Sequence, residues 1–228
     1  MIIKLCKCHL IYLVNRLFIY VFIIITILNL AYNIFVINSM DKYLSLVEES
    51  KFYYLSCFQI YRLEILLFTL LISSFFFISN NDQYRALILP SGISRNKYFI
   101  TKIVTITCLL LIITIFEGLL IMIVAGIWNI DFYLDFVLCE IDLIISLLYF
   151  MLVSVLFIQI TDSIYIIIGS FVLLLFTSLD IGNSFFKYFI CIVNENMRFF
   201  VSEIYYIFFV CLLLVINIIL YNKRDLQT

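Results

Sequence analysis

The side chains that could carry chemistry are few, and the most suggestive of them lie at the start of the chain. Cys6, Cys8 and the single histidine, His9, are residue types that coordinate zinc. A zinc site needs a further pair of ligands at a regular spacing, and the remaining cysteines are scattered along apolar runs without a repeat. The sequence therefore predicts no metal site and no disulfide framework, and the seven cysteines are expected to pack as small apolar side chains.

The chain also lacks the residue patterns of common phosphate-binding and hydrolytic sites. A P-loop needs the pattern G-x-x-x-x-G-K-[ST], and none of the five glycines stands in one. The H-E-x-x-H motif of zinc proteases cannot be built from a single histidine. The sequence predicts no catalytic residue and no cofactor bound by this chain, so any ATP-driven step would require an ATPase in a separate partner subunit.

The composition is typical of a protein in a lipid bilayer. Hydrophobic residues make up 66% of the chain and charged residues 13%, and the mean hydropathy is +1.20. Soluble domains are usually about 45–50% apolar and about 25% charged. The scarcity of alanine beside abundant Ile, Phe, Tyr and Asn is typical of an AT-rich bacterial genome, so we expect a bacterial plasma membrane. The net charge of -1 gives no reason to expect a nucleic-acid partner.

Stretches almost free of charge predict an all-α membrane protein with six spans. A helix rises about 1.5 Å per residue and needs roughly 20 apolar residues to cross a hydrocarbon core of about 30 Å. The spans are expected at residues 17–40, 57–81, 103–130, 143–161, 163–179 and 204–222. One helix over residues 143–179 would be about 55 Å long, so a hairpin is predicted there. In the second span, Arg62 and Glu64 are expected near the entrance, where their side chains can reach the interface.

One acidic residue, Glu117, stands in the middle of the third predicted span. An ionised acid at that depth costs on the order of 3 kcal/mol or more, so the side chain is expected to face other helices or a cavity. The nearest basic residue of its span, Lys102, is about 22 Å away along a helix axis, so no ion pair is expected within the helix. Two interpretations stay open. Glu117 lines a polar path or a gate between subunits, or it is a neutral carboxyl bonded to Thr114 or to a neighbouring helix.

The distribution of basic residues predicts that both termini face the cytoplasm, because cytoplasmic segments of membrane proteins are enriched in Lys and Arg. With the N-terminus inside, nine basic residues are cytoplasmic: Lys4, Lys7, Arg16, Arg85, Arg95, Lys97, Lys102, Lys223 and Arg224. Five are on the outside: Lys42, Lys51, Arg62, Lys187 and Arg198. Four acids are expected in an outer loop without Lys or Arg: Asp131, Asp135, Glu140 and Asp142.

Three further segments flank the spans. Residues 1–16 place Lys4 and Lys7 on one arc with apolar residues outside it, which suits an amphipathic elbow helix lying on the inner leaflet. Residues 38–62 are predicted as an outer segment. Residues 180–203 are rich in aromatic side chains and are expected to form an outer re-entrant or interfacial segment, or an ordinary loop that follows the membrane surface.

Residues 80–102 form the only sizeable cytoplasmic loop of this topology and contain the one proline of the chain. Pro90 is followed by Gly92, and the two break helices, while Ser94 is expected to cap a helix that starts at Arg95. Binding to lipid headgroups would explain the basic charges of the loop, but it requires neither the break nor the capped restart. A shaped loop of this kind favours docking of a protein partner.

This loop resembles the cytoplasmic loop between the second and third spans of type-2 ABC exporter permeases. The matching residues are Arg85, Leu89-Pro90, Ser94-Arg95, Tyr98 and Lys102, and with Lys97 they form the expected contact surface. In that family the loop forms a coupling helix that docks on an ATPase subunit. Its members have six spans, both termini inside, an N-terminal elbow helix and a re-entrant outer segment before the sixth span. The chain is most similar to the bacteriocin-immunity and peptide-antibiotic-resistance branch.

The resemblance implies a single transmembrane permease domain over residues 1–228, with residues 80–102 as the coupling loop. It implies export of a hydrophobic or peptide substrate, an ABC ATPase partner that binds ATP and magnesium, and a second permease subunit in a homo- or heterodimer. Ser91-Gly92-Ile93 separate Pro90 from Ser94, where many relatives have a single residue. This departure fits a proline that belongs to the helix break.

Three other functions stay open at this point. A non-transporting immunity or scaffold protein could bind a toxin at the membrane, since a fold does not fix a function. Proton- or ion-coupled secondary transporters usually have broken helices and internal repeats, and the sequence shows no repeat and no proline inside a span. A membrane enzyme is suggested by Glu48-Glu49, which resemble the glutamate pair of prenyl-protein endopeptidases. Tyr53 stands where that family has an arginine, and no set of histidines follows.

Overall fold

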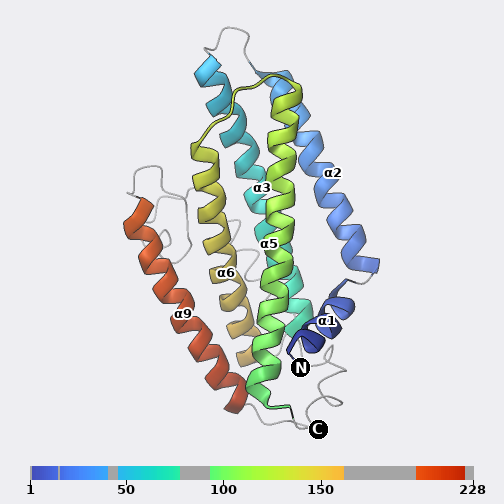
Figure 1. Ribbon diagram of the computed structural model, residues 1–228, viewed down its shortest axis with the longest axis vertical. Coiled ribbons are helices and arrows are strands. Elements are labelled where there is room, and N and C mark those ends of the chain that lie inside the picture. The colour runs from blue at the N-terminus through green and yellow to red at the C-terminus, as the bar shows by residue number, and fades with distance from the viewer. Residues whose placement is uncertain (1, 15, 41–45, 78–92, 162–198, 224–228) are drawn as a thin grey trace.

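The computed structural model describes residues 2–14, 16–40, 46–77, 93–161 and 199–223. These residues form helices and no strands (Figure 1). The helices are α1 (Ile2–Leu13), α2 (Arg16–Ser39), α3 (Leu46–Phe77), α5 (Arg95–Ile127), α6 (Asp135–Thr161) and α9 (Phe199–Lys223). Four of them, α2, α3, α5 and α6, are long and apolar enough to cross a membrane. The prediction of an all-α protein of multi-pass membrane character is confirmed for this part of the chain.

Five of the predicted spans fall on observed helices. The first, third and fourth largely coincide with α2, α5 and α6, the described part of the second lies within α3, and the sixth lies within α9. The predicted fifth span, residues 163–179, lies outside the described residues, as does most of the outer segment expected at 180–203. The count of six spans and the orientation of the termini remain predictions.

The predicted outer segment 38–62 and the second span share one helix over residues 46–77, because α3 is continuous for 32 residues from Leu46. Arg62 and Glu64 lie in the middle of this helix. The outer position of this segment and the entrance of the span stay predictions. The helix contains neither proline nor glycine, and its first half buries aromatic side chains such as Tyr53 and Tyr61 inside the bundle.

A second correction concerns the acidic outer loop. Helix α6 begins at Asp135, so Glu140 and Asp142 are helical and only residues 128–134 connect α5 to α6. An acidic residue in the first turn of a helix interacts favourably with the helix dipole. Asp135 therefore suits the start of α6, although its charge contributed to the prediction of a loop.

The turn after α5 has the hydrogen bonds of a Schellman motif. Asn129 has a φ of 56°, the left-handed region that closes many helices. Its N–H donates to the carbonyl of Gly126 at 3.3 Å, and the N–H of Ile130 donates to the carbonyl of Ala125 at 2.9 Å. The motif ends α5 sharply and turns the chain toward α6.

The long helices lie side by side in one bundle, with α9 packed against α6 (Figure 1). The short helix α1 lies at the lower end, against the beginning of α5. We call this the α1 end of the bundle. It also contains the last turns of α3 and α9. The opposite end holds the end of α2, the start of α3 and the α5–α6 turn.

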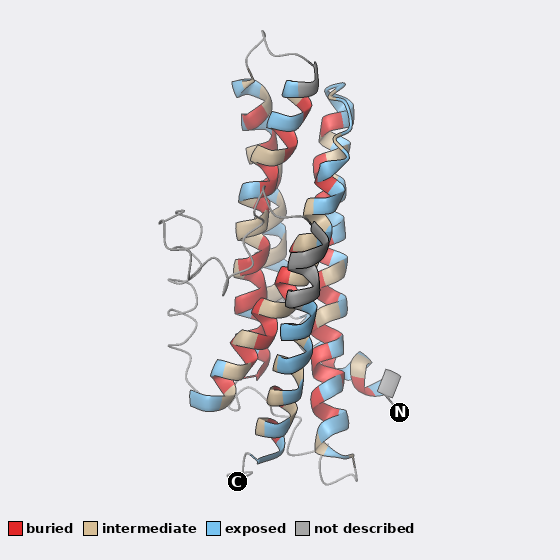
Figure 2. Cartoon of the chain, turned by 90° about the vertical axis from the view of Figure 1, so that its left-hand side faces the viewer, coloured by how far each residue is buried: buried red, intermediate tan, exposed pale blue. Residues whose placement is uncertain are grey.

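The core follows the whole length of the bundle (Figure 2). It is rich in aromatic side chains, among which Tyr53, Tyr61, Phe68, Tyr98 and Phe99 are almost fully buried. Helix α2 is the exception, because only 17% of the residues in its most apolar stretch are buried, compared with 61% for α3. A helix that exposes this much apolar surface suits contact with lipid.

Candidate functional site

Glu117 lies at the centre of a hydrogen-bonded contact between α5 and α2. Its side chain is fully buried. The Thr26 hydroxyl lies 2.5 Å from its Oε1, and the Asn29 amide donates to its Oε2 at 2.7 Å. Both partners stand on α2, one turn apart. The carboxyl group therefore has a partner on each oxygen, supplied by the neighbouring helix.

The network continues from Asn29 toward α3. Asn33 donates from Nδ2 to Oδ1 of Asn29 at 2.8 Å, and the hydroxyl of Tyr53 donates to Oδ1 of Asn33 at 2.7 Å. Tyr53 also lies 3.1 Å from the carbonyl oxygen of Ile121 on α5. Each of these side-chain donors points along the chain of bonds toward Glu117. The result is a buried polar link between α2, α3 and α5.

A second carboxyl group, Glu140 of α6, approaches α5 on another side. The hydroxyl of Tyr61 donates to the carbonyl oxygen of Thr114 at 2.7 Å and lies 3.2 Å from Oε2 of Glu140. Gly118 provides the space: a Cβ at this position would lie 2.7 Å from Oε1 of Glu140. That oxygen is buried and has no hydrogen-bond partner among the described residues.

Glu64 adds a third carboxyl group to the interior. It follows Tyr61 by three residues, so both lie on the same side of α3. Its Oε2 atom is buried and finds no hydrogen-bond donor within the part of the chain that the structure describes. Three carboxyl groups, Glu64, Glu117 and Glu140, thus stand between helices that are apolar enough to cross a membrane. Such groups can hold a proton, line a polar path or bond helices together.

The sequence analysis singled out Glu117 and suggested two bonding partners for it, Thr114 or a neighbouring helix. Only the second is observed. The hydroxyl of Thr114 donates to the carbonyl of Leu110 at 2.8 Å and not to Glu117, so the partner is a neighbouring helix. The sequence analysis missed Thr26, Asn29 and Asn33. Their spacing of three and four residues along an apolar span places them on one face of a helix, and this was the available signal.

No group of three potential metal ligands from Cys, His, Asp or Glu gathers among the described residues. Within the α1 segment, Cys8 is exposed on the helix surface while His9 is buried against α5. The two therefore turn to different sides of α1.

The residues expected to dock an ATPase gather at the α1 end, as far as they are described. Ser94 is the N-cap residue of α5, with φ −64° and ψ 143°, but its hydroxyl makes no capping hydrogen bond with a described residue. Arg95 is partly buried and its guanidinium lies 3.4 Å from the carbonyl oxygen of Asn222 in α9. Lys97 is exposed. Arg85 and Pro90 lie outside the described residues.

Tyr98 and Lys102, in contrast, point into the protein. Lys102 is 3% exposed, and its Nζ donates to the carbonyl oxygen of Phe76 at 2.8 Å. The ammonium group also lies 4.8 Å from the ring centre of Phe76, 5.2 Å from that of Phe77 and 5.4 Å from that of Tyr98. We call these three rings with Lys102 the Lys102 cage. Neither buried side chain presents a surface to a partner in this arrangement.

Helix α1 is attached to the same place through His9. The imidazole meets the ring of Phe76 edge-on at 5.5 Å and the ring of Tyr98 at 5.0 Å. Its Nε2 lies 3.5 Å from the hydroxyl of Thr101. The thiol of Cys6 lies 4.0 Å from the carbonyl oxygen of Thr101. The N-terminal helix is therefore held on the first turns of α5 by polar and aromatic contacts together.

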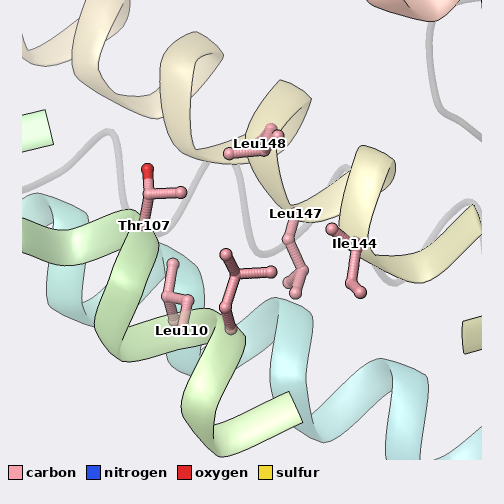
Figure 3. A pocket seen from close by; sticks show the side chains of 6 residues that line it. Thr107, Leu110, Ile144, Leu147 and Leu148 are labelled. Atoms are coloured by element: carbon pink, nitrogen blue, oxygen red, sulfur yellow. The ribbon is translucent and has the colours of Figure 1, made fainter. Parts of the chain in front are cut away.

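One small notch opens between α5 and α6, lined by apolar side chains (Figure 3). Leu110 of α5 and Leu147 of α6 point into it, and Thr107 and Leu148 lie at its edge. Nothing polar converges on it, since the Thr107 hydroxyl contacts the sulfur of Met151 at 3.9 Å. The notch has the character of imperfect packing between two helices.

The chain was also compared with known proteins. No protein-family model matches it, and no curated protein is similar enough to count as a relative.

Proposed function

We propose that the chain is the membrane-spanning permease subunit of an ATP-driven exporter. The observation that carries the proposal is the construction of the α1 end. Helix α5 starts at Arg95, directly after the Pro90–Ser94 segment, and exposes Lys97 on its first turn. Helix α1 packs beside this start as an elbow helix would. Multi-pass helices with a basic start of α5 support the resemblance to type-2 ABC exporter permeases.

The partners follow from the same resemblance. An ABC ATPase subunit, which binds ATP and magnesium, would dock at the α1 end from the cytoplasm. A second permease subunit, identical or different, would complete the transport path in the bacterial plasma membrane. The substrate would be a hydrophobic molecule or a peptide, such as a bacteriocin, an antimicrobial peptide or a drug.

Charge reversal at Lys97 tests the docking. Lys97 is exposed, so Lys97→Glu should weaken co-purification of the native ATPase while leaving the amount of inserted protein unchanged. Lys51 is an exposed lysine at the opposite end of the bundle, and Lys51→Glu is the matched control. If both variants retain the ATPase equally well and still stimulate its ATP hydrolysis, the start of α5 is not the docking surface.

The carboxyl groups between the helices favour a second candidate, a proton- or ion-coupled secondary transporter. Glu117 is fully buried, Glu64 and Glu140 are half-buried, and embedded acids are common in such transporters. Protection of cells against a panel of antimicrobial peptides separates the candidates. Protection that requires an active ATPase supports the exporter, and protection that survives without ATPase but requires a proton gradient supports the secondary transporter. Protection that needs neither indicates a non-transporting immunity or scaffold protein.

A further inference from the structure

The Lys102 cage lies where the chain enters and leaves the segment expected to dock a partner. Phe76 and Phe77 are the last residues of α3 before positions 78–92, and α5 begins at Arg95 soon after them. The ammonium group of Lys102 is bonded to the last turn of α3 while its own backbone belongs to the second turn of α5. It thus joins the two sides of this segment directly.

The contacts of Lys102 hold the last turn of α3 against α5 strongly and in one geometry. A cation near a helix C-terminus interacts with carbonyl groups that have no partner in the helix. A cation over aromatic rings is attracted by their quadrupoles, and more strongly when water is excluded. Lys102 makes both kinds of contact at one buried point, so its removal takes the charged contact between α3 and α5 away and leaves ring contacts such as that of Phe77 with Phe99.

Rings of the cage, and Phe99 beside them, also contact α1 and α9. His9 brings α1 onto Phe76 and Tyr98. Phe77 of the cage contacts the ring of Phe99 at 5.6 Å, and Phe99 stacks on Tyr221 of α9 with ring centres 4.6 Å apart. A displacement of the cage would therefore act on α1 and α9 as well as on α3 and α5.

We propose that Lys102 is a positioning residue that fixes α1, the last turn of α3 and the first turns of α5 as one rigid unit. A force that a docked partner exerts on positions 78–94 then moves these elements together and displaces the spanning helices. The identity of that partner, an ATPase subunit, rests on the proposed function. The rigid unit itself does not, so the two are tested separately.

The rigid unit is tested by a distance between two spin labels on the complete chain in lipid nanodiscs. Leu71 on α3 and Asn96 on α5 are both exposed and accept cysteines in a cysteine-free background. The distance distribution should be narrow in the parent and about twofold broader in Lys102→Met, because the last turns of α3 then sample positions independently of α5. Lys102→Arg keeps the charge over the rings and should preserve the narrow distribution. Lys51→Met is the control for loss of an exposed lysine.

A second variant covers the case in which Lys102→Met does not fold. Phe77→Leu keeps the ammonium group and its carbonyl acceptor but removes one ring, and it should broaden the distribution to a smaller extent. Narrow distributions in both Lys102→Met and Phe77→Leu would overturn the rigid unit, whatever the function of the chain.

The coupling is tested on the complex with the ATPase that co-purifies from the native host. Lys102→Met should retain the ATPase, while permease-dependent ATP hydrolysis falls by about thirtyfold, the factor that corresponds to losing a desolvated cation–π contact. Unchanged hydrolysis would overturn the coupling role and leave the proposed function standing. If the parent chain recruits no ATPase, the proposed function fails and the coupling role fails with it.

Discussion

Glu117 is held by two donors that could serve a carboxylic acid or a carboxylate. The hydroxyl of Thr26 lies within hydrogen-bond distance of both Glu117 and the carbonyl of Phe22, at 3.1 Å from the latter. When this hydroxyl donates to Phe22, its oxygen can accept a hydrogen from Glu117, and Asn29 still donates to the other carboxyl oxygen. A glutamine would fit the same positions, with its NH₂ group toward Thr26 and its carbonyl toward Asn29.

Glu117→Gln is therefore expected to retain transport or resistance, and Glu117→Lys to abolish it. A lysine places a second donor against the Asn29 amide and an uncompensated charge inside the bundle, and breaking a buried polar contact in this way costs about 1–3 kcal/mol or more. The measurement is activity per amount of protein in the membrane. Loss of activity in a well-inserted Glu117→Gln protein would mean that the charge or its proton is used, which favours the secondary transporter.

Gly118 lies directly against the carboxyl group of Glu140. In Gly118→Ala the new Cβ would lie 2.7 Å from Oε1 of Glu140, so the carboxyl must shift, and we expect this shift to weaken its hydrogen bond with Tyr61. At Gly126, on the same helix, a Cβ would meet nothing within 4 Å. Alanine in the middle of a helix stabilises the folded state by about 0.5–1 kcal/mol relative to glycine. Gly126→Ala should therefore raise the unfolding temperature of the protein in detergent.

Gly118→Ala should be less stable than Gly126→Ala by about 1 kcal/mol, the value of one hydrogen bond. Adding Glu140→Ala to both proteins should remove the difference, because the carboxyl that the new Cβ meets is then absent. A difference that persists without the Glu140 carboxyl would place the close contact elsewhere.

At the scale of elements, the end of α5 depends on one left-handed residue. Asn129 has a φ of 56°, which asparagine and glycine accept and a β-branched residue does not. Asn129→Gly should keep or raise the unfolding temperature, and Asn129→Val should lower stability by about 1–2 kcal/mol. Asp131 lies in the same turn and has no positive φ, so Asp131→Val is the control. Equal stability of the two valine variants would contradict the role of the turn.

The elements were predictable from the sequence where a helix break, a capping residue or the end of an apolar run marks their limits. The start of α5 at Arg95 followed from Ser94 and the break at Pro90–Gly92, and the apolar runs gave α2 and the body of α6. The first half of α3 was not predicted as part of a span because the five charged residues of this helix interrupt the apolar run that defines a span. Charge counts along a sequence do not show which side chains a neighbouring helix will cover, and Arg62 and Glu64 are accommodated only within the assembled bundle.

At the scale of the whole molecule, polar contacts explain why the helices keep one arrangement in lipid. Apolar side chains gain little by leaving lipid for another helix, so packing and interhelical hydrogen bonds decide the assembly. Glu117 fixes α2, Glu140 approaches α3 and α5, and Asn217 of α9 donates to the carbonyl of Leu152 in α6 at 3.0 Å. The apolar pattern predicted the helices, whereas these long-range partners could not be assigned without the fold.

The bundle also sharpens the prediction of orientation. Asn96 stands at the α1 end and Asp135 at the opposite end, and both are exposed. Nine basic residues against five favour a cytoplasmic α1 end. Single cysteines in a cysteine-free background are probed with an impermeant thiol reagent. In intact cells we expect labelling at position 135 and none at position 96 until the membrane is opened.

Two further positions serve as internal controls for the same experiment. Asn222 is exposed at the α1 end and Lys51 at the opposite end, so a cysteine at 222 should behave like that at 96, and one at 51 like that at 135. The reverse pattern at all four positions would keep the bundle and invert its orientation. The start of α5 would then be out of reach of a cytoplasmic ATPase, and the exporter proposal would fail.

Helix α5 is long enough for its first turns to stand in water. It has 33 residues and extends about 50 Å, compared with a hydrocarbon core of about 30 Å. Position 96 should therefore react fully once the reagent has access, and failure to react after opening the membrane would mean that the start of α5 is embedded and cannot dock a soluble subunit.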